Sequence, residues 1–116
     1  MIFNPFSRGS AVREVSVQDL ARAHAEGAIV VDCREPWEYV NGHVPGAILL
    51  PLGQIAERAR EVPTGGPVYV ICQSGNRSQL GSQLLGRAGY EAYSVAGGTG
   101  RWILSGHPVV TGTTPS

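Results

Sequence analysis

Short apolar runs of strand length alternate along this chain with segments whose apolar residues recur at helical spacing. The strand candidates are residues 12–15, 29–31, 48–50, 68–71 and 92–95. A continuously apolar run such as 29–31 is typical of a strand that is covered on both faces. The alternation therefore predicts an α/β fold with a mainly parallel sheet and helices on both faces.

Three of the segments between these runs carry a stripe of apolar residues at helical spacing. The stripes are Val17, Leu20, Ala21 and Ala25; Leu52, Ile55, Ala56 and Ala59; and Leu80, Leu84, Leu85 and Ala88. Ser16 is placed to cap the first helix, with Asp19 in capping-box position, and Gly27 is placed to end it. The stretch 32–47 is irregular, apart from a short helix that begins near Pro36.

A cysteine directly follows the fourth apolar run and stands at the mouth of a polar loop. The loop residues are Cys72, Gln73, Ser74, Gly75, Asn76, Arg77 and Ser78. Because the loop runs into a helix, its backbone N–H groups and the positive end of the helix dipole can converge on one atom. A thiol held there loses its proton easily and becomes a nucleophile. Since ligands bind at the carboxyl ends of parallel strands, this segment predicts an enzyme that works through sulfur chemistry.

The composition narrows the class of partner. The chain has 116 residues, and its nine arginines balance nine acidic residues, with no lysine. This length predicts one domain, and zero net charge lacks the basic footprint that binds nucleic acid or an anionic membrane. No apolar stretch approaches the length of a membrane span, and residues 1–8 do not resemble a signal peptide. We therefore expect a cytoplasmic protein that binds neither nucleic acid nor membranes.

The two cysteines are too few and too far apart in the sequence for a disulfide scaffold or a structural zinc site. They are Cys33 and Cys72. No cluster of His, Cys and Asp residues has metal-ligand spacing. We expect no metal site and no cofactor, and two free thiols suit a catalytic role better than a structural one.

In three stretches the chain resembles the single-domain rhodaneses, which are sulfurtransferases. The stretches are Val31-Asp32-Cys33-Arg34 with Glu38-Tyr39 and Gly42-His43-Val44-Pro45-Gly46-Ala47; the loop from Cys72 to Ser78; and Val95-Ala96-Gly97-Gly98 with Trp102. They follow one another in the order found in that family. The resemblance implies a five-stranded parallel sheet flanked by helices. It places a rhodanese-like domain at residues 11–110, between a flexible lead-in at 1–10 and a flexible tail at 111–116.

The resemblance also implies an activity and a site. Cys72 would accept a sulfane sulfur from a small-molecule donor such as thiosulfate and pass it, as a persulfide, to cyanide or a thiol, including a protein thiol. Substrate binding is expected from the rest of the loop, namely Gln73, Ser74, Gly75, Asn76, Arg77 and Ser78. Arg77 is the only formal charge in the loop and would stabilise the anionic sulfur species. Ser78 is also placed to cap the following helix.

Two other functions are consistent with parts of the same pattern. Rhodanese-like domains also serve as non-catalytic binding or regulatory modules, although those often lack the loop cysteine. Cysteine-dependent phosphatases and some arsenate reductases pair a cysteine with an arginine across an anion-binding loop that is one residue longer. Here four residues separate Cys72 from Arg77, and Ile71 stands where many of those phosphatases carry a histidine. The pattern therefore favours the sulfurtransferase.

Cys33 has two interpretations. Cysteine is among the residue types most often buried, so core packing is the first. The resemblance places its strand beside the strand of Cys72, so that both cysteines would end neighbouring parallel strands. The second interpretation is that Cys33 is a resolving thiol, which protects Cys72 by forming a disulfide with it.

The remaining polar and aromatic candidates are expected to be mainly structural. Asp32 and Arg34 are expected to tie neighbouring loops together through hydrogen bonds and an ion pair with a residue such as Glu38, because buried charges need partners. The alternative is that they contact the substrate at the strand end. His43 lies in a turn and is interpreted as a structural hydrogen-bonding residue. Two tryptophans, Trp37 and Trp102, are typical of core or rim packing, with the mouth of the active-site pocket as the alternative.

Overall fold

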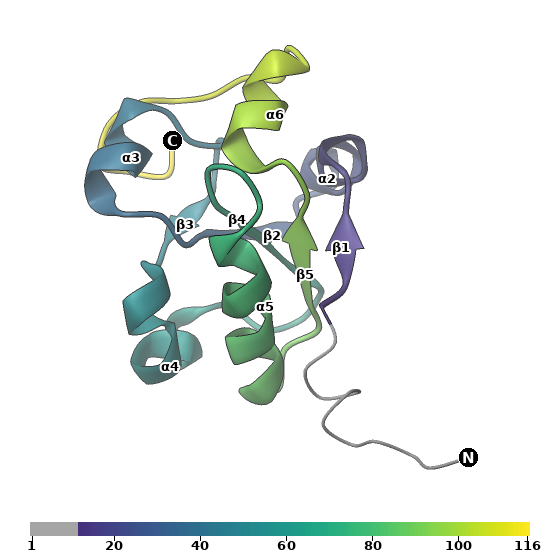
Figure 1. The fold of residues 1–116 in the computed structure, drawn as a ribbon, viewed down its shortest axis with the longest axis vertical. Coiled ribbons are helices and arrows are strands. Elements are labelled where there is room, and N and C mark those ends of the chain that lie inside the picture. The colour runs from purple at the N-terminus through teal and green to yellow at the C-terminus, as the bar shows by residue number, and fades with distance from the viewer. Residues whose placement is uncertain (1–11) are drawn as a thin grey trace.

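A five-stranded parallel sheet lies at the centre of the computed structural model, which describes residues 12–116 (Figure 1). The strands are β1 (Glu14–Val15), β2 (Ile29–Asp32), β3 (Ile48–Leu49), β4 (Val68–Ile71) and β5 (Ala92–Val95). Their order across the sheet is β1-β5-β4-β2-β3, and each neighbouring pair is parallel. The predicted fold class is confirmed. The lead-in expected at residues 1–10 lies outside the described residues.

Helices cover both faces of this sheet. They are α2 (Val17–Ala25), α3 (Pro36–Asn41), α4 (Ile55–Arg58), α5 (Arg77–Arg87) and α6 (Gly98–Leu104), with short 3₁₀ turns η1 (Leu52–Gln54) and η2 (Ala59–Glu61) on either side of α4. Successive strand residues point to opposite faces, so Val70 packs with α4 and α5, while Ile71 packs with α2, α3 and α6. None of these helices is long and apolar enough to span a membrane.

The first helix begins as its sequence predicts. The Ser16 hydroxyl accepts from the Asp19 backbone N–H at 3.0 Å, and the Asp19 carboxylate accepts from the Ser16 N–H at 3.1 Å. This reciprocal pair satisfies two backbone donors that helix geometry leaves without partners. The capping box therefore fixes where the chain turns from β1 into α2.

The polar segment 111–116, expected to form a flexible tail, lies against the end of α3. The Gly112 N–H donates to the Val40 carbonyl at 2.9 Å, and the Gly46 N–H donates to the Pro115 carbonyl at 2.9 Å. Just before this segment, Val110 forms an antiparallel bridge with His43. The structure thus places the C-terminal residues on the body of the domain.

The register of the two central strands brings the cysteines together. Asp32 at the end of β2 is aligned with Ile71 at the end of β4, so the next residues, Cys33 and Cys72, are also neighbours. The Cys33 N–H donates to the Ile71 carbonyl at 2.9 Å, which continues the ladder past the last strand residue. Both cysteines therefore lie at the carboxyl edge of the sheet, where parallel sheets bind ligands.

Candidate active site

The loop between β4 and α5 is held closely against the turn that precedes α6 (Figure 1). The Thr99 N–H and hydroxyl both donate to the Cys72 carbonyl, at 2.8 and 3.0 Å. Gly75 has a φ of +99°, and a Cβ atom at this position would lie 2.9 Å from the Gly97 nitrogen. Glycine is therefore required at Gly75 both for its backbone conformation and for the close approach of the two loops.

Hydrogen-bond donors from this loop converge on the sulfur of Cys72. The Gly75 N–H reaches Sγ at 3.1 Å and the Ser78 N–H reaches it at 3.3 Å, while the Ser78 hydroxyl lies 3.5 Å away. The cysteine is buried, with 1 % of its surface exposed. The predicted convergence of backbone donors on one atom is thus seen for two N–H groups, with the loop side chains Gln73, Ser74 and Asn76 facing solvent.

These contacts favour the ionised form of the thiol. A hydrogen bond from Cys33, together with those from the Ser78 side chain and the backbone of Ser78 and Gly75, lowers the pKa of Cys72 to about 4 against the opposing effect of burial. The same hydrogen bond to Cys72, with burial, raises the pKa of Cys33. Cys72 is therefore the thiolate at neutral pH and Cys33 is its protonated neighbour.

A buried serine that the sequence analysis did not single out supports the same sulfur. The Ser94 hydroxyl, on β5, lies 2.8 Å from the Ser78 hydroxyl, and both residues are completely buried. A thiolate only accepts hydrogen bonds, so the Ser78 hydroxyl must donate to it and is then free to accept from Ser94. Ser94 thereby orients the Ser78 proton toward the sulfur. Its only sequence signal is a small hydroxyl residue inside a predicted strand.

Ser78 itself lies inside α5 and does not cap it. The N-cap of α5 is Asn76, and no side chain makes the capping hydrogen bond. The expectation that Ser78 caps this helix is wrong, because its N–H and hydroxyl are directed at the Cys72 sulfur instead.

Arg77 is bound in a bidentate ion pair with Glu38 from α3. Its two terminal nitrogens donate to the two carboxylate oxygens at 2.7 and 2.8 Å. Glu38 raises the pKa of Arg77 most strongly, and the Cys72 thiolate adds to this effect. The expected ion pair between Glu38 and Arg34 is wrong: the fold brings the N-terminus of α5 to α3, and Glu38 pairs there. Part of the Arg77 charge is thus already neutralised before a donor arrives.

Arg34 contacts the β4–α5 loop from the β2 side through a hydrogen bond to Gln73. It is buried and makes an ion pair with the buried carboxylate of Asp32 at 2.8 Å. Its remaining donors reach the Gln73 side-chain oxygen at 3.0 Å and the Gly42 carbonyl at 2.7 Å. As expected from the sequence, Asp32 and Arg34 join neighbouring loops, and Gln73 in the candidate site is one of the residues they hold.

A shallow pocket of about 280 Å³ opens beside the loop. Exposed apolar side chains from Trp37 and Ile103 line it, together with Gln73 and Thr99. Trp102 is not part of this lining. It is buried in the core, and its ring N–H donates to the Pro108 carbonyl at 2.7 Å. Of the two tryptophans, only Trp37 is placed at the mouth of the site.

His43 has the structural role expected of it. Its ring stacks on Tyr39, with the centroids 3.5 Å apart, and both ring nitrogens contact backbone carbonyls, those of Tyr39 at 2.7 Å and Thr114 at 2.9 Å. In the part of the chain that the structure describes, its ring makes no hydrogen bond to the loop, so it is not placed to act as a general base on Cys72.

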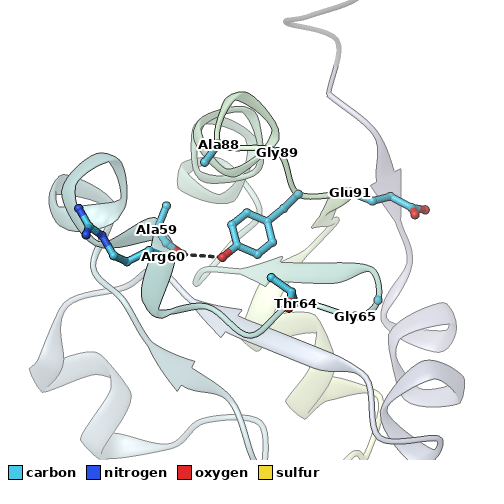
Figure 2. A pocket seen from close by; sticks show the side chains of 9 residues that line it. Ala59, Arg60, Thr64, Gly65, Ala88, Gly89 and Glu91 are labelled. Atoms are coloured by element: carbon cyan, nitrogen blue, oxygen red, sulfur yellow. Dashed lines mark hydrogen bonds between the residues drawn. The ribbon is translucent and has the colours of Figure 1, made fainter.

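A larger pocket, of about 500 Å³, lies at the opposite end of the strands, beside the amino ends of β4 and β5 (Figure 2). Its lining includes Thr64 and Gly65, which precede β4, and Glu91, which precedes β5. The Tyr90 hydroxyl donates to the Ala59 carbonyl at 2.8 Å on one side of it. No cysteine lines this pocket; Cys33 and Cys72 both lie at the carboxyl ends of the strands. Within residues 12–116, no group of His, Cys, Asp and Glu side chains is arranged to hold a metal ion.

Comparison with known proteins agrees with this geometry. A family model described as the rhodanese-like domain matches residues 16–105. The chain is 35% identical over 94 residues to thiosulfate sulfurtransferase GlpE of Pseudomonas entomophila, covering 80% of this chain and 86% of that protein. It is 40% identical over 82 residues to the uncharacterized protein YqhL of Bacillus subtilis, covering 70% of this chain and 65% of that protein. A rhodanese-related protein from Thermoplasma volcanium superimposes with a TM-score of 0.80 at 31% identity, covering 86% of this chain and 99% of that one.

Proposed function

The chain belongs to the rhodanese-like domain family, and we propose that it moves a sulfane sulfur from a donor such as thiosulfate to cyanide or a thiol through a persulfide on Cys72. The observation that carries the proposal is the buried Cys72 sulfur, whose pKa is lowered to about 4 by converging hydrogen bonds. A sulfur atom held in this way is a nucleophile at neutral pH without a separate general base.

In the first half-reaction the Cys72 thiolate attacks the outer sulfur of thiosulfate. The new S–S bond forms as the bond to the sulfite group breaks, so that Cys–S⁻ and thiosulfate give Cys–S–S⁻ and sulfite. The negative charge moves to the outer sulfur, which we place among the loop donors from Gln73 to Ser78. The positive charge of Arg77 attracts the anionic donor, although the ion pair with Glu38 weakens this attraction.

In the second half-reaction an acceptor removes the outer sulfur and restores the thiolate. Cyanide gives thiocyanate, and a thiol gives a new persulfide on the acceptor. The pocket beside the loop supports the approach of a thiol on a larger molecule, because Trp37 and Ile103 offer apolar contact surface there. We also propose the cytoplasm as the place of this reaction, since Cys33 and Cys72 are both free thiols.

Initial-rate kinetics test the proposal. A covalent intermediate that forms before the acceptor binds is expected to give a ping-pong pattern. Thiocyanate formation is measured while thiosulfate is varied at several fixed cyanide concentrations, and parallel double-reciprocal lines are expected. Intersecting lines contradict the two-step route. Absence of thiocyanate at every concentration favours a non-catalytic binding module.

A further inference from the structure

The mechanism above uses one of two adjacent thiols. Cys33 is completely buried, belongs to the same core cluster as Cys72, and follows a strand residue that is aligned with the last residue of β4. Aligned residues on neighbouring strands lie about 4.8 Å apart, and disulfides span Cα separations of roughly 4.4–6.8 Å. The spacing of the two strands is therefore compatible with a bond between the two sulfurs.

The surroundings of Cys33 make its position specific. Its sulfur packs beneath α5, where a Cβ atom on Gly81 would lie 3.5 Å from it. Gly81 is unfavourable inside a helix, yet a Cβ atom there would lie only 3.1 Å from Val70 Cγ1 and 3.3 Å from Ile55 Cδ1, so its missing side chain lets α5 pack closely on the sheet above Cys33. Cys33 thus reaches Cys72 from the β2 side, whereas the backbone donors of Gly75 and Ser78 belong to the loop.

We propose that Cys33 is an internal acceptor, which attacks the persulfide on Cys72 when no external acceptor arrives and releases hydrosulfide. This inference rests on the proposed function. The Cys33 sulfur bonds to the Cys72 Sγ, the bond from Sγ to the outer sulfur breaks, and a Cys33–Cys72 disulfide forms. Because the donors of Gly75 and Ser78 belong to the loop and Cys33 follows β2, we place the outer sulfur on the loop side of Sγ, opposite the attacking thiol.

The step is balanced without an added oxidant. Cys72–S–S⁻ and Cys33–SH give Cys72–S–S–Cys33 and HS⁻, so three sulfurs, one proton and one negative charge appear on each side. The sulfane sulfur is reduced to sulfide, and the two protein thiols are oxidised. The proton of Cys33, which the thiolate of Cys72 holds in place beforehand, leaves with the sulfide. An external dithiol restores both thiols by exchange.

The test compares the wild-type chain with Cys33→Ser after incubation with thiosulfate and no acceptor. Serine keeps a hydrogen-bond donor beside Cys72 but cannot form the disulfide. Cys33→Ala serves as a second variant if the serine chain does not fold. Released sulfide is quantified, and intact mass is recorded. Because trypsin cuts after arginine, Cys33 falls in residues 23–34 and Cys72 in residues 61–77, so a disulfide links these two peptides.

In the wild-type chain we expect one sulfide per chain, a mass lower by two hydrogen atoms and linked peptides. In Cys33→Ser we expect one added sulfur atom on residues 61–77 and no sulfide. A wild-type chain that keeps its added sulfur without releasing sulfide overturns the inference and leaves the proposed function intact. If neither chain gains sulfur and neither releases sulfide, the proposed function itself is contradicted.

Discussion

Replacing Cys72 by serine is expected to lower thiocyanate formation by at least roughly 10³-fold, to the level of the uncatalysed reaction. A serine hydroxyl is not ionised at neutral pH and cannot carry a sulfane sulfur, so both half-reactions are lost. The measurement is the initial rate from thiosulfate and cyanide at saturating concentrations of both.

The same substitution should leave the fold in place. Serine differs from cysteine by one atom and can still accept from the Gly75 and Ser78 N–H groups. The unfolding transition is therefore recorded beside the rate, which separates lost chemistry from lost structure. A folded Cys72→Ser chain whose rate stays within about tenfold of the wild type contradicts a persulfide on Cys72.

Replacing Gly98 by alanine is expected to lower the free energy of unfolding by roughly 2–5 kcal/mol. Gly98 has a φ of +60°, and a Cβ atom there would lie 2.5 Å from the Cys72 carbonyl oxygen and 2.6 Å from the Gln73 carbonyl. The clash is with backbone, which cannot rotate away. Either the turn before α6 or the loop after β4 must move, so activity is expected to fall as well. Urea denaturation measures the change in stability.

Gly106→Ala is the matched control. Gly106 has a φ of +83°, yet nothing lies within 4 Å of the position that its Cβ would occupy. It should cost about 1–2 kcal/mol from the left-handed backbone alone, without loss of sulfur transfer. Equal destabilisation by the two alanines would show that the contact between the α6 turn and the loop adds nothing to stability.

The local elements of this fold were predictable because each depends on neighbours in sequence. The apolar run before Cys72 indicated β4, and Ser16 with Asp19 indicated the start of α2; both are confirmed. The candidate active-site loop could be found in the same way, since a cysteine, a glycine and an arginine within a few residues already indicate an anion-binding turn.

The partners that cross between elements were not predictable from local pattern. Ser94 supports Ser78 because β5 lies beside β4 in the sheet, and a hydroxyl in a buried strand does not indicate which loop it faces. Glu38 pairs with Arg77, not Arg34, because long charged side chains meet whatever the tertiary fold brings near. Trp102 was ambiguous between core and rim, a choice that only the packing of α6 settles.

The titration of Cys72 tests most directly whether this loop exists to stabilise one ionised sulfur. The rate of alkylation of Cys72 in the native chain is measured across pH, with the modified peptide identified by mass. With a pKa lowered to about 4, the thiolate should persist from neutral pH down to that value. The contribution of the thiolate to folding stability is fully present above the pKa of the unfolded chain, and it should be lost as pH falls through the lower pKa of the folded chain. A midpoint near 8.5, about that of an unperturbed cysteine, would contradict the account.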